Sequence, residues 1–141
     1  MAQLKILFVC IGNSCRSPMA EAMARSLGGD RVVTLSAGLS PAGFIAGPTV
    51  ETLERLGYPS DRLYSKGLDA IPDDDVDLVV SLLGGESFHV LPQGGSARHE
   101  SWTIPDPFGE DDAFYLRVAR DLEIRINELL SRELEGELLG E

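Results

Sequence analysis

The sequence predicts an α/β fold, a three-layer sandwich in which a four-stranded parallel sheet carries helices on both faces. Apolar runs of strand length alternate along the chain with segments whose apolar residues recur at helical spacing. The first run, Leu4–Cys10, is apolar almost throughout, as expected of a parallel strand that is buried on both faces. The 141 residues contain no repeat and no low-complexity tract, so we expect a single domain over residues 1–141.

The first helix is expected directly after the loop that follows the first strand. Ser17 is a candidate N-cap, Pro18 suits the first helical position, and Gly28 with Gly29 ends the helix. Apolar residues recur between them at helical spacing, at Ala20, Met23, Ala24 and Leu27. The next predicted elements are the strand Val32–Ser36 and the helix Thr49–Leu56, whose apolar side holds Val50, Leu53 and Leu56 and which Gly57 ends.

The second half of the chain predicts two further strands and a long helix. The third strand is Val76–Leu83 and a short fourth strand is His99–Ile104, with a short helix expected around Glu86–Leu91 in the glycine-rich stretch between them. The last helix begins near the acidic residues 110–112, which suit the positive end of a helix. Its apolar residues recur at intervals of four, at Phe114, Val118, Leu122, Ile126 and Leu130. Residues 136–141 are expected to fray.

Charge and hydropathy narrow the class of protein. A net charge of −11 argues against a nucleic-acid partner, because counterion release at phosphates needs a basic face. A mean hydropathy of +0.00 describes an ordinary globular protein. No apolar stretch approaches the ~20 residues of a membrane span, and the N-terminus lacks a signal-type apolar run. We therefore expect a cytoplasmic protein with no membrane partner.

The segment Cys10–Ser17 reads CIGNSCRS and joins the first strand to the first helix. The residues between Cys10 and Arg16 are enough to wrap a loop around an oxyanion, with backbone N–H groups and the helix N-terminus pointing at it. Arg16 adds a planar fork of donors that grips two phosphoryl oxygens. These donors favour the thiolate form of Cys10, which makes it a nucleophile. The predicted phosphate-binding residues are Ile11, Gly12, Asn13, Ser14, Cys15, Arg16 and Ser17.

The stretch Cys10–Glu21 closely resembles the signature of the low-molecular-weight protein tyrosine phosphatases. Two more stretches fit the same family, Ser36–Gly38 after the second strand and Ile104–Gly109 late in the chain. The resemblance implies hydrolysis of phosphomonoesters, on protein tyrosine, on another phosphorylated residue or on a small molecule, through a cysteinyl-phosphate. It also implies phosphate, sulfate or arsenate as loop-bound anions and no cofactor.

Asp106 is the predicted general acid. Pro105 and Pro107 hold its backbone extended and rigid, which helps to place its carboxyl over a neighbouring site, although an Asp-Pro pair is equally a turn pattern. The resemblance favours the acid: Asp106 protonates the leaving oxygen and later activates water. Arg16 and the loop N–H groups then stabilise the equatorial oxygens of the transition state.

The resemblance assigns supporting roles to four further residues. Ser17 is implied to hydrogen-bond the Cys10 thiolate, and Asn13 to prop the loop with Ser36 as a second partner. Cys15 is implied to close a reversible disulfide with Cys10; a small packing residue is the alternative. The resemblance does not name the substrate, whose predicted cleft is lined by Ile11, Ala42 and Phe108.

Several positions depart from the tyrosine-specific pattern. Ala42 lies near the place where many such phosphatases carry an aromatic wall after the second strand. Ser14 replaces a branched aliphatic residue and is closer to the threonine of arginine phosphatases, so a protein arginine phosphatase stays an alternative. Leu82 and Leu83 follow the third strand where eukaryotic relatives have Met-Asp.

Arsenate reductases share this superfamily and its loop, which accepts arsenate as a near-isostere of phosphate. The thioredoxin-coupled reductases need two further cysteines, yet no cysteine follows Cys15 and that relay cannot operate here. Pro18, where those reductases typically have Gln, also favours a phosphatase. An arsenate reductase that uses an external thiol remains the alternative, and a non-catalytic phosphate-binding module is a third. His89 and His99 lack ligand-spaced partners, so no metal site is expected.

Overall fold

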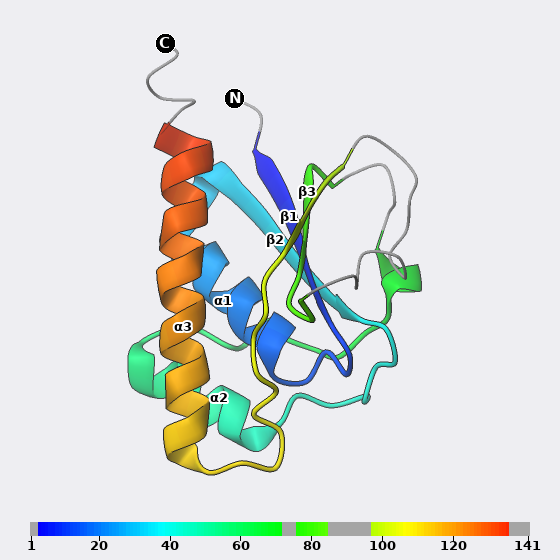
Figure 1. The fold of residues 1–141 in the computed structure, drawn as a ribbon, viewed down its shortest axis with the longest axis vertical. Coiled ribbons are helices and arrows are strands. Elements are labelled where there is room, and N and C mark those ends of the chain that lie inside the picture. The colour runs from blue at the N-terminus through cyan, green and yellow to red at the C-terminus, as the bar shows by residue number, and fades with distance from the viewer. Residues whose placement is uncertain (1–2, 72–75, 85–96, 136–141) are drawn as a thin grey trace.

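The computed structural model describes residues 3–71, 76–84 and 97–135 (Figure 1). Within these ranges four strands form one parallel sheet of order β2-β1-β3-β4. The strands are β1 (Leu4–Cys10), β2 (Val32–Gly38), β3 (Leu78–Ser81) and β4 (Arg98–Ser101). The chain order reverses beside β1, and ligands of open α/β sheets bind at the carboxyl ends of strands at such a point. Cys10 is the last residue of β1.

Three α-helices lie in the described ranges: α1 (Arg16–Gly28), α2 (Gly47–Leu56) and α3 (Asp112–Leu130). Helices α1 and α3 cover one face of the sheet, and α2 packs against α3 near its N-terminal end (Figure 1). The other face carries the 3₁₀ helix η2 (Leu68–Ala70), whose Leu68 packs on that side of the sheet. The three-layer prediction is therefore confirmed, while the short helix expected around Glu86–Leu91 lies outside the described residues.

Alternate residues of the central strand enter two separate apolar clusters. Ile6 and Phe8 pack with the residues of α1 and α3, whereas Leu7 and Val9 pack with the cluster on the opposite face. Successive side chains of a strand point to opposite faces, so a strand covered on both sides must be apolar throughout. The continuous apolar run of β1 is explained in this way.

The boundaries of three strands differ from the prediction. β2 continues to Gly38, two residues beyond the predicted end at Ser36, because it pairs with β1 as far as Cys10. β3 ends at Ser81 instead of Leu83, because Leu83 forms an isolated antiparallel bridge with Thr103. β4 begins at Arg98 and ends at Ser101, since the chain then turns into that bridge. Leu27, predicted on the apolar side of the first helix, is 40% exposed, because it lies with Ser26 on the exposed side of the last turn of α1.

Two shorter helical segments complete the described chain. The 3₁₀ helix η1 (Gly29–Arg31) joins α1 to β2, and the π-helical turn η5 (Ser131–Glu135) continues α3. None of the helices in the described residues is long and apolar enough to cross a membrane.

Candidate active site

The loop between β1 and α1 is held from outside through its carbonyl groups. The carbonyls of Cys10, Ile11, Gly12 and Ser14 accept backbone hydrogen bonds of 2.9–3.1 Å from the N–H groups of Leu39, Ser40, Ala42 and Ala46. The Thr49 hydroxyl donates a further hydrogen bond to the Ser14 carbonyl at 2.9 Å. With the carbonyls directed at the segment 39–49, the N–H groups of the loop lie on its concave side, as in an anion-binding nest.

Gly38 allows this segment to approach the loop closely. A Cβ at Gly38 would lie 2.5 Å from the Ile11 carbonyl oxygen and 2.9 Å from the Asn13 nitrogen, both of them backbone atoms. Neither backbone atom can move without breaking the loop, so only glycine fits where β2 ends. The Ser-Ala-Gly stretch, expected after the second strand, forms the end of β2, and the close approach to the loop explains its glycine.

Asn13 is the residue about which the loop turns. Its φ of 49° lies in the left-handed region, which Asn tolerates better than other residues with a side chain. Its Oδ1 accepts from the Lys66 backbone N–H at 2.9 Å, which fixes the orientation of the amide. Its Nδ2 then donates to Ser17 Oγ at 2.8 Å and to Ser36 Oγ at 3.0 Å. The structure therefore brings together the three supporting residues that the sequence singled out.

The Ser17 hydroxyl lies 2.8 Å from the Cys10 sulfur. Because the Ser17 oxygen already accepts from Asn13, its own proton is available to the sulfur. Ser17 is the second residue of α1 and not the N-cap that the sequence predicted; the N-cap is Cys15, without a side-chain cap. The hydroxyl cannot cap the helix because it is engaged by Asn13 and Cys10.

Buried charges beyond Ser36 extend this network, and sequence reasoning missed them. The Ser36 hydroxyl donates to one oxygen of the Glu21 carboxylate, whose other oxygen pairs with Arg25. The Lys66 ammonium lies 3.8 Å from the same carboxylate. Burial lowers the pKa of Lys66, and the Glu21 charge acts in the opposite direction. Glu21 lay within the recognised signature, but nothing in its spacing indicated that it would face Ser36.

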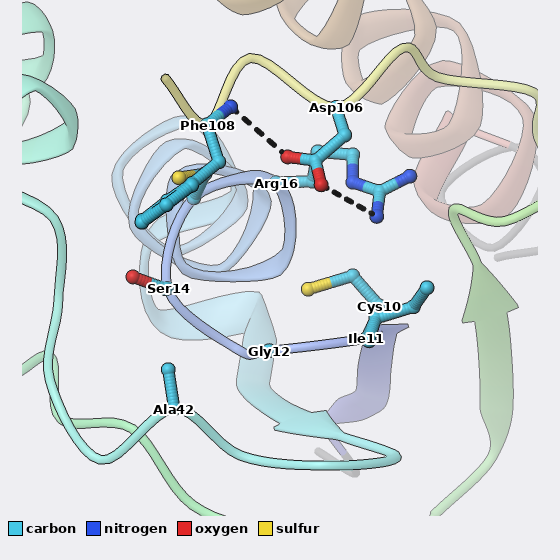
Figure 2. Close-up of a pocket in the computed structure, with 9 residues that line it drawn as sticks. Cys10, Ile11, Gly12, Ser14, Arg16, Ala42, Asp106 and Phe108 are labelled. Atoms are coloured by element: carbon cyan, nitrogen blue, oxygen red, sulfur yellow. Dashed lines mark hydrogen bonds and ion pairs between the residues drawn. The ribbon is translucent and has the colours of Figure 1, made fainter.

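The Arg16 guanidinium is fixed from behind by carbonyl groups that follow β3 and β4. Its Nη1 donates to the Ile104 carbonyl at 3.0 Å and, more weakly, to the Leu82 carbonyl at 3.5 Å. The side chain is 8% exposed and its Nη2 lies 3.8 Å from Asp106 Oδ2 (Figure 2). The guanidinium is therefore held largely out of solvent at the wall of the cavity, with its Nη2 facing Asp106.

The contacts of Asp106 fit both roles that the sequence left open, a turn residue and a candidate general acid. One carboxylate oxygen accepts from the Phe108 backbone N–H at 3.1 Å, which is the turn pattern. The other oxygen faces Arg16, and the side chain is 53% exposed. Figure 2 shows this carboxylate on the opposite side of the pocket from the loop that carries Cys10. The turn thus positions the carboxylate over the site.

A cavity of about 210 Å³ lies between the loop and Asp106 (Figure 2). The predicted cleft residues all line it, together with the catalytic candidates; the lining residues are Cys10, Ile11, Gly12, Ser14, Cys15, Arg16, Ala42, Asp106 and Phe108. Its volume suits a tetrahedral oxyanion and part of an attached group. Arg16 and the concave N–H groups supply donors, and Asp106 supplies a carboxylate.

Phe44 is a second aromatic residue near this cavity, which sequence reasoning missed. Its ring centroid lies 6.4 Å from that of Phe108, and the two side chains are 52% and 57% exposed. Phe44 lies two positions after Ala42 and reaches the cavity through Phe108, which lines it. The sequence feature that could have pointed to Phe44 is a phenylalanine in a stretch that has neither helical nor strand periodicity, where a large apolar side chain is expected to be exposed.

Cys15 lies beneath the loop, against α3. Its sulfur is 3.3 Å from the hydroxyl of Tyr115, a residue that is 1% exposed. Burial raises the pKa of both groups. Tyr115 was missed because the predicted apolar side of the last helix was read at intervals of four from Phe114, one residue earlier.

Comparison with known proteins shows the family of the chain. The sequence model of the family described as "Low molecular weight phosphotyrosine protein phosphatase" matches residues 5–138. The chain belongs to this family. It is 29% identical over 129 residues to the glutaredoxin arsenate reductase of Synechocystis sp., covering 91% of this chain and 97% of that protein.

Solved structures of the low-molecular-weight phosphatase family show the same fold. An arsenate reductase from Archaeoglobus fulgidus superposes with a TM-score of 0.78 at 28% identity, over 89% of this chain and 98% of that one. A low-molecular-weight protein tyrosine phosphatase from T. tengcongensis gives a TM-score of 0.78 at 24% identity, over 92% and 99% of the two chains. The fold and the family are thus shown, and the named relatives favour the arsenate reductase alternative more than the phosphatase.

In the described ranges, no group of three His, Cys, Asp or Glu side chains is placed to hold a metal ion. His99 is an exposed residue of β4, and His89 lies outside the described residues.

Proposed function

We propose that the protein hydrolyses phosphomonoesters through a cysteinyl-phosphate on Cys10. The Cys10 thiolate, stabilised by the Ser17 hydroxyl at 2.8 Å, attacks phosphorus in line with the leaving oxygen. Arg16 and the concave N–H groups of the loop stabilise the equatorial oxygens, whose charge is spread over the transition state. The S–P bond forms as the P–O bond to the leaving group breaks.

Asp106 serves both halves of the proposed reaction. Its carboxylic acid protonates the leaving oxygen in the first step, and its carboxylate then takes a proton from the water that attacks the cysteinyl-phosphate. That attack breaks the S–P bond and returns the thiolate, with Ser17 again donating to it. Phosphate leaves, and the loop is restored.

The observation that carries this proposal is the Asp106 carboxylate on the same small cavity as Cys10. An ester needs a proton at its leaving oxygen, and a half-exposed carboxyl near Arg16 can both reach it and exchange protons with solvent. Phe44 and Phe108 beside the cavity favour an aryl group next to the phosphate, and hence phosphotyrosine in a protein. A phosphoarginine substrate is the alternative within this class.

The test is turnover of p-nitrophenyl phosphate, phosphotyrosine peptide and phosphoarginine by the wild type and Cys10→Ser. We expect the wild type to hydrolyse the aryl esters fastest, and Cys10→Ser to lose at least about 10³-fold in kcat because oxygen replaces the sulfur nucleophile. Binding of phosphate to Cys10→Ser, followed by calorimetry, controls for an intact loop. Equal turnover by the variant would overturn the proposal.

The second candidate function is arsenate reduction, which the named relatives support. Arsenate fits the same donors as phosphate, and Cys10 would attack arsenic in place of phosphorus. No cysteine follows Cys15 in the chain, so a relay through later cysteines is ruled out. Production of arsenite with glutathione, thioredoxin or glutaredoxin as reductant tests this candidate independently of ester hydrolysis.

A further inference from the structure

Both cysteines of the chain lie in the phosphate-binding loop. Cys10 is its first residue and Cys15 immediately precedes Arg16. Both side chains line the same cavity. Burial raises the pKa of Cys15, and the negative charges of Asp106 and Cys10 raise it further. The two thiols of this loop can therefore supply two electrons by forming a disulfide with each other.

We propose that Cys10 and Cys15 together reduce arsenate to arsenite in a single turnover, without any further cysteine. The proposal rests on the attack by Cys10 at a loop-bound oxyanion and goes beyond ester hydrolysis. It accounts for a chain whose named relatives include arsenate reductases although it holds only these two thiols.

The reaction balances within the loop. The Cys10 thiolate displaces a hydroxyl group from arsenate, which leaves as water after protonation, and an S–As(V) bond forms. The Cys15 thiolate then attacks the Cys10 sulfur; the S–S bond forms as the S–As bond breaks, and its electron pair stays on arsenic as As(III). Two thiols are oxidised, one arsenic is reduced, and arsenite leaves. An external dithiol or a thiol protein then reduces the Cys10–Cys15 disulfide.

To make this move, the side chain of Cys15 must leave its contacts with Tyr115 and Thr49, while the backbone of the loop stays in place. The backbone at both cysteines is fixed, because the Cys10 carbonyl accepts from Leu39 and the Cys15 carbonyl accepts from Met19, each at 3.0 Å. Closure therefore requires side-chain rotation more than backbone change. The Cys15 sulfur gives up its contact of 3.3 Å with the Tyr115 hydroxyl and its contact with the Thr49 side chain. Thiols are weak donors and acceptors, so neither contact is as strong as a backbone hydrogen bond.

A phosphate ester in the same loop does not trigger this step. Phosphorus(V) does not accept the electron pair, so the cysteinyl-phosphate is hydrolysed and both thiols survive. Burial keeps Cys15 protonated near neutral pH, since its pKa is raised. The arsenate reaction should therefore accelerate with rising pH, by up to about tenfold per unit while the thiolate fraction of Cys15 is small.

The experiment is a single turnover of fully reduced protein after removal of all reductant under anaerobic conditions. We expect wild type to release one arsenite per chain and to lose both free thiols, with a Cys10–Cys15 disulfide identified by peptide mass spectrometry. Cys15→Ser and Cys15→Ala should release almost no arsenite without added thiol. Phosphate in place of arsenate controls for oxidation by other routes, and it should leave both thiols intact.

The outcomes separate this proposal from the proposed phosphatase. Wild type that hydrolyses p-nitrophenyl phosphate but releases no arsenite in the single turnover overturns the two-thiol reduction and leaves the phosphatase standing. Wild-type arsenite yields from both Cys15 variants also overturn it. Mapping of the disulfide in the wild type tests the proposal even if both variants fail to fold.

Discussion

At the scale of single residues, Asp106 shows how one side chain can be both a turn residue and a catalytic candidate. Its Oδ1 is engaged by the Phe108 N–H, and its Oδ2 lies 3.8 Å from Arg16. A residue fixed in this way keeps its position even when its charge is removed. Substitution by asparagine should therefore change the chemistry while the turn is retained.

Asp106→Asn is expected to slow hydrolysis by about 10²–10⁴-fold for phenyl phosphate, whose basic leaving oxygen needs a proton. The loss should be much smaller for 2,4-dinitrophenyl phosphate, whose leaving group departs unaided. The measurement is kcat/KM over a series of leaving groups, with unfolding by urea as the control for an intact fold. A uniform loss across the series would mean that Asp106 only shapes the loop.

Phe44→Ala should raise KM for aryl phosphates several-fold, because the substrate ring loses an apolar contact of roughly 1 kcal/mol. Phosphate and methyl phosphate carry no ring and should bind as well as to the wild type. Leu27→Ala is the matched control, since Leu27 is also partly exposed but lies in the last turn of α1. If Phe44→Ala weakens phosphate binding as much as aryl binding, the ring supports the loop and not the substrate.

Some site residues could be predicted from sequence because their roles depend on local spacing. Cys10 and Arg16 bound one short loop, and Asn13 sits where that loop needs a positive φ. Phe44 and Tyr115 could not be predicted, because each reaches the site only after segments distant in the chain have packed together. The assignment of Ser17 as a helix cap was wrong because its hydroxyl had another partner within the loop.

At the scale of elements, α3 carries a cap that can be tested separately. The Asp111 side chain accepts from the Phe114 N–H at 2.9 Å, and so satisfies one of the free donors of the first turn. The same turn presents Tyr115 to Cys15. The cap therefore stabilises both the helix and the floor beneath the loop.

Asp111→Ala should lower the free energy of unfolding by about 1 kcal/mol, because the cap is lost. Asp111→Asn retains a side-chain acceptor and should lose much less. Urea denaturation of both variants measures the difference, with Glu110→Ala as the control for removal of a nearby charge. Equal losses for Asp111→Ala and Glu110→Ala would indicate a charge effect and no cap.

Element boundaries were less predictable than the elements themselves. The strand β1 was predicted with its observed ends, because the continuous apolar run ends at Cys10, where the phosphate-binding loop begins. β3 and β4 end earlier than predicted, because Leu83 and Thr103, which the apolar pattern had placed in these strands, form an isolated antiparallel bridge instead. Such a bridge joins residues distant in the chain, and no local pattern reports it.

At the scale of the whole molecule, the layers followed from the alternation of strand and helix patterns, whereas the strand order came only from the structure. The contact between Tyr58 and Glu123 joins the end of α2 to α3 across this architecture. Burial, and to a smaller extent the hydrogen bond to Glu123, raises the pKa of Tyr58 to about 12. The Tyr58 hydroxyl in turn lowers the pKa of Glu123.

The pH dependence of this contact follows from both shifts. The raised tyrosine pKa contributes stability that is complete below about pH 10 and is lost as pH rises through about 12. The lowered carboxyl pKa contributes stability that is present above about pH 4.5 and is lost as pH falls through the folded value. The contact should therefore be fully stabilising between about pH 5 and 10.

Tyr58→Phe should destabilise the protein by about 1–2 kcal/mol within that window, because a hydrogen bond to a charged partner is lost. The difference from wild type should shrink below about pH 4.5 and above about pH 10. Urea denaturation from pH 4 to 11 checks this, with the exposed Tyr64→Phe as the control. A difference that does not vary with pH would place the effect in packing.

The outward carbonyls of the loop have a consequence for hydrogen exchange. These carbonyls accept from the N–H groups of Leu39, Ser40, Ala42 and Ala46, so those four amides should exchange slowly with deuterated solvent whether or not an anion is present. The loop residues that line the cavity are Ile11, Gly12, Ser14, Cys15 and Arg16, and we expect their amides to exchange more quickly in the empty protein. Phosphate or arsenate should slow this second set alone, which gives a residue-by-residue count of the donors that hold the anion.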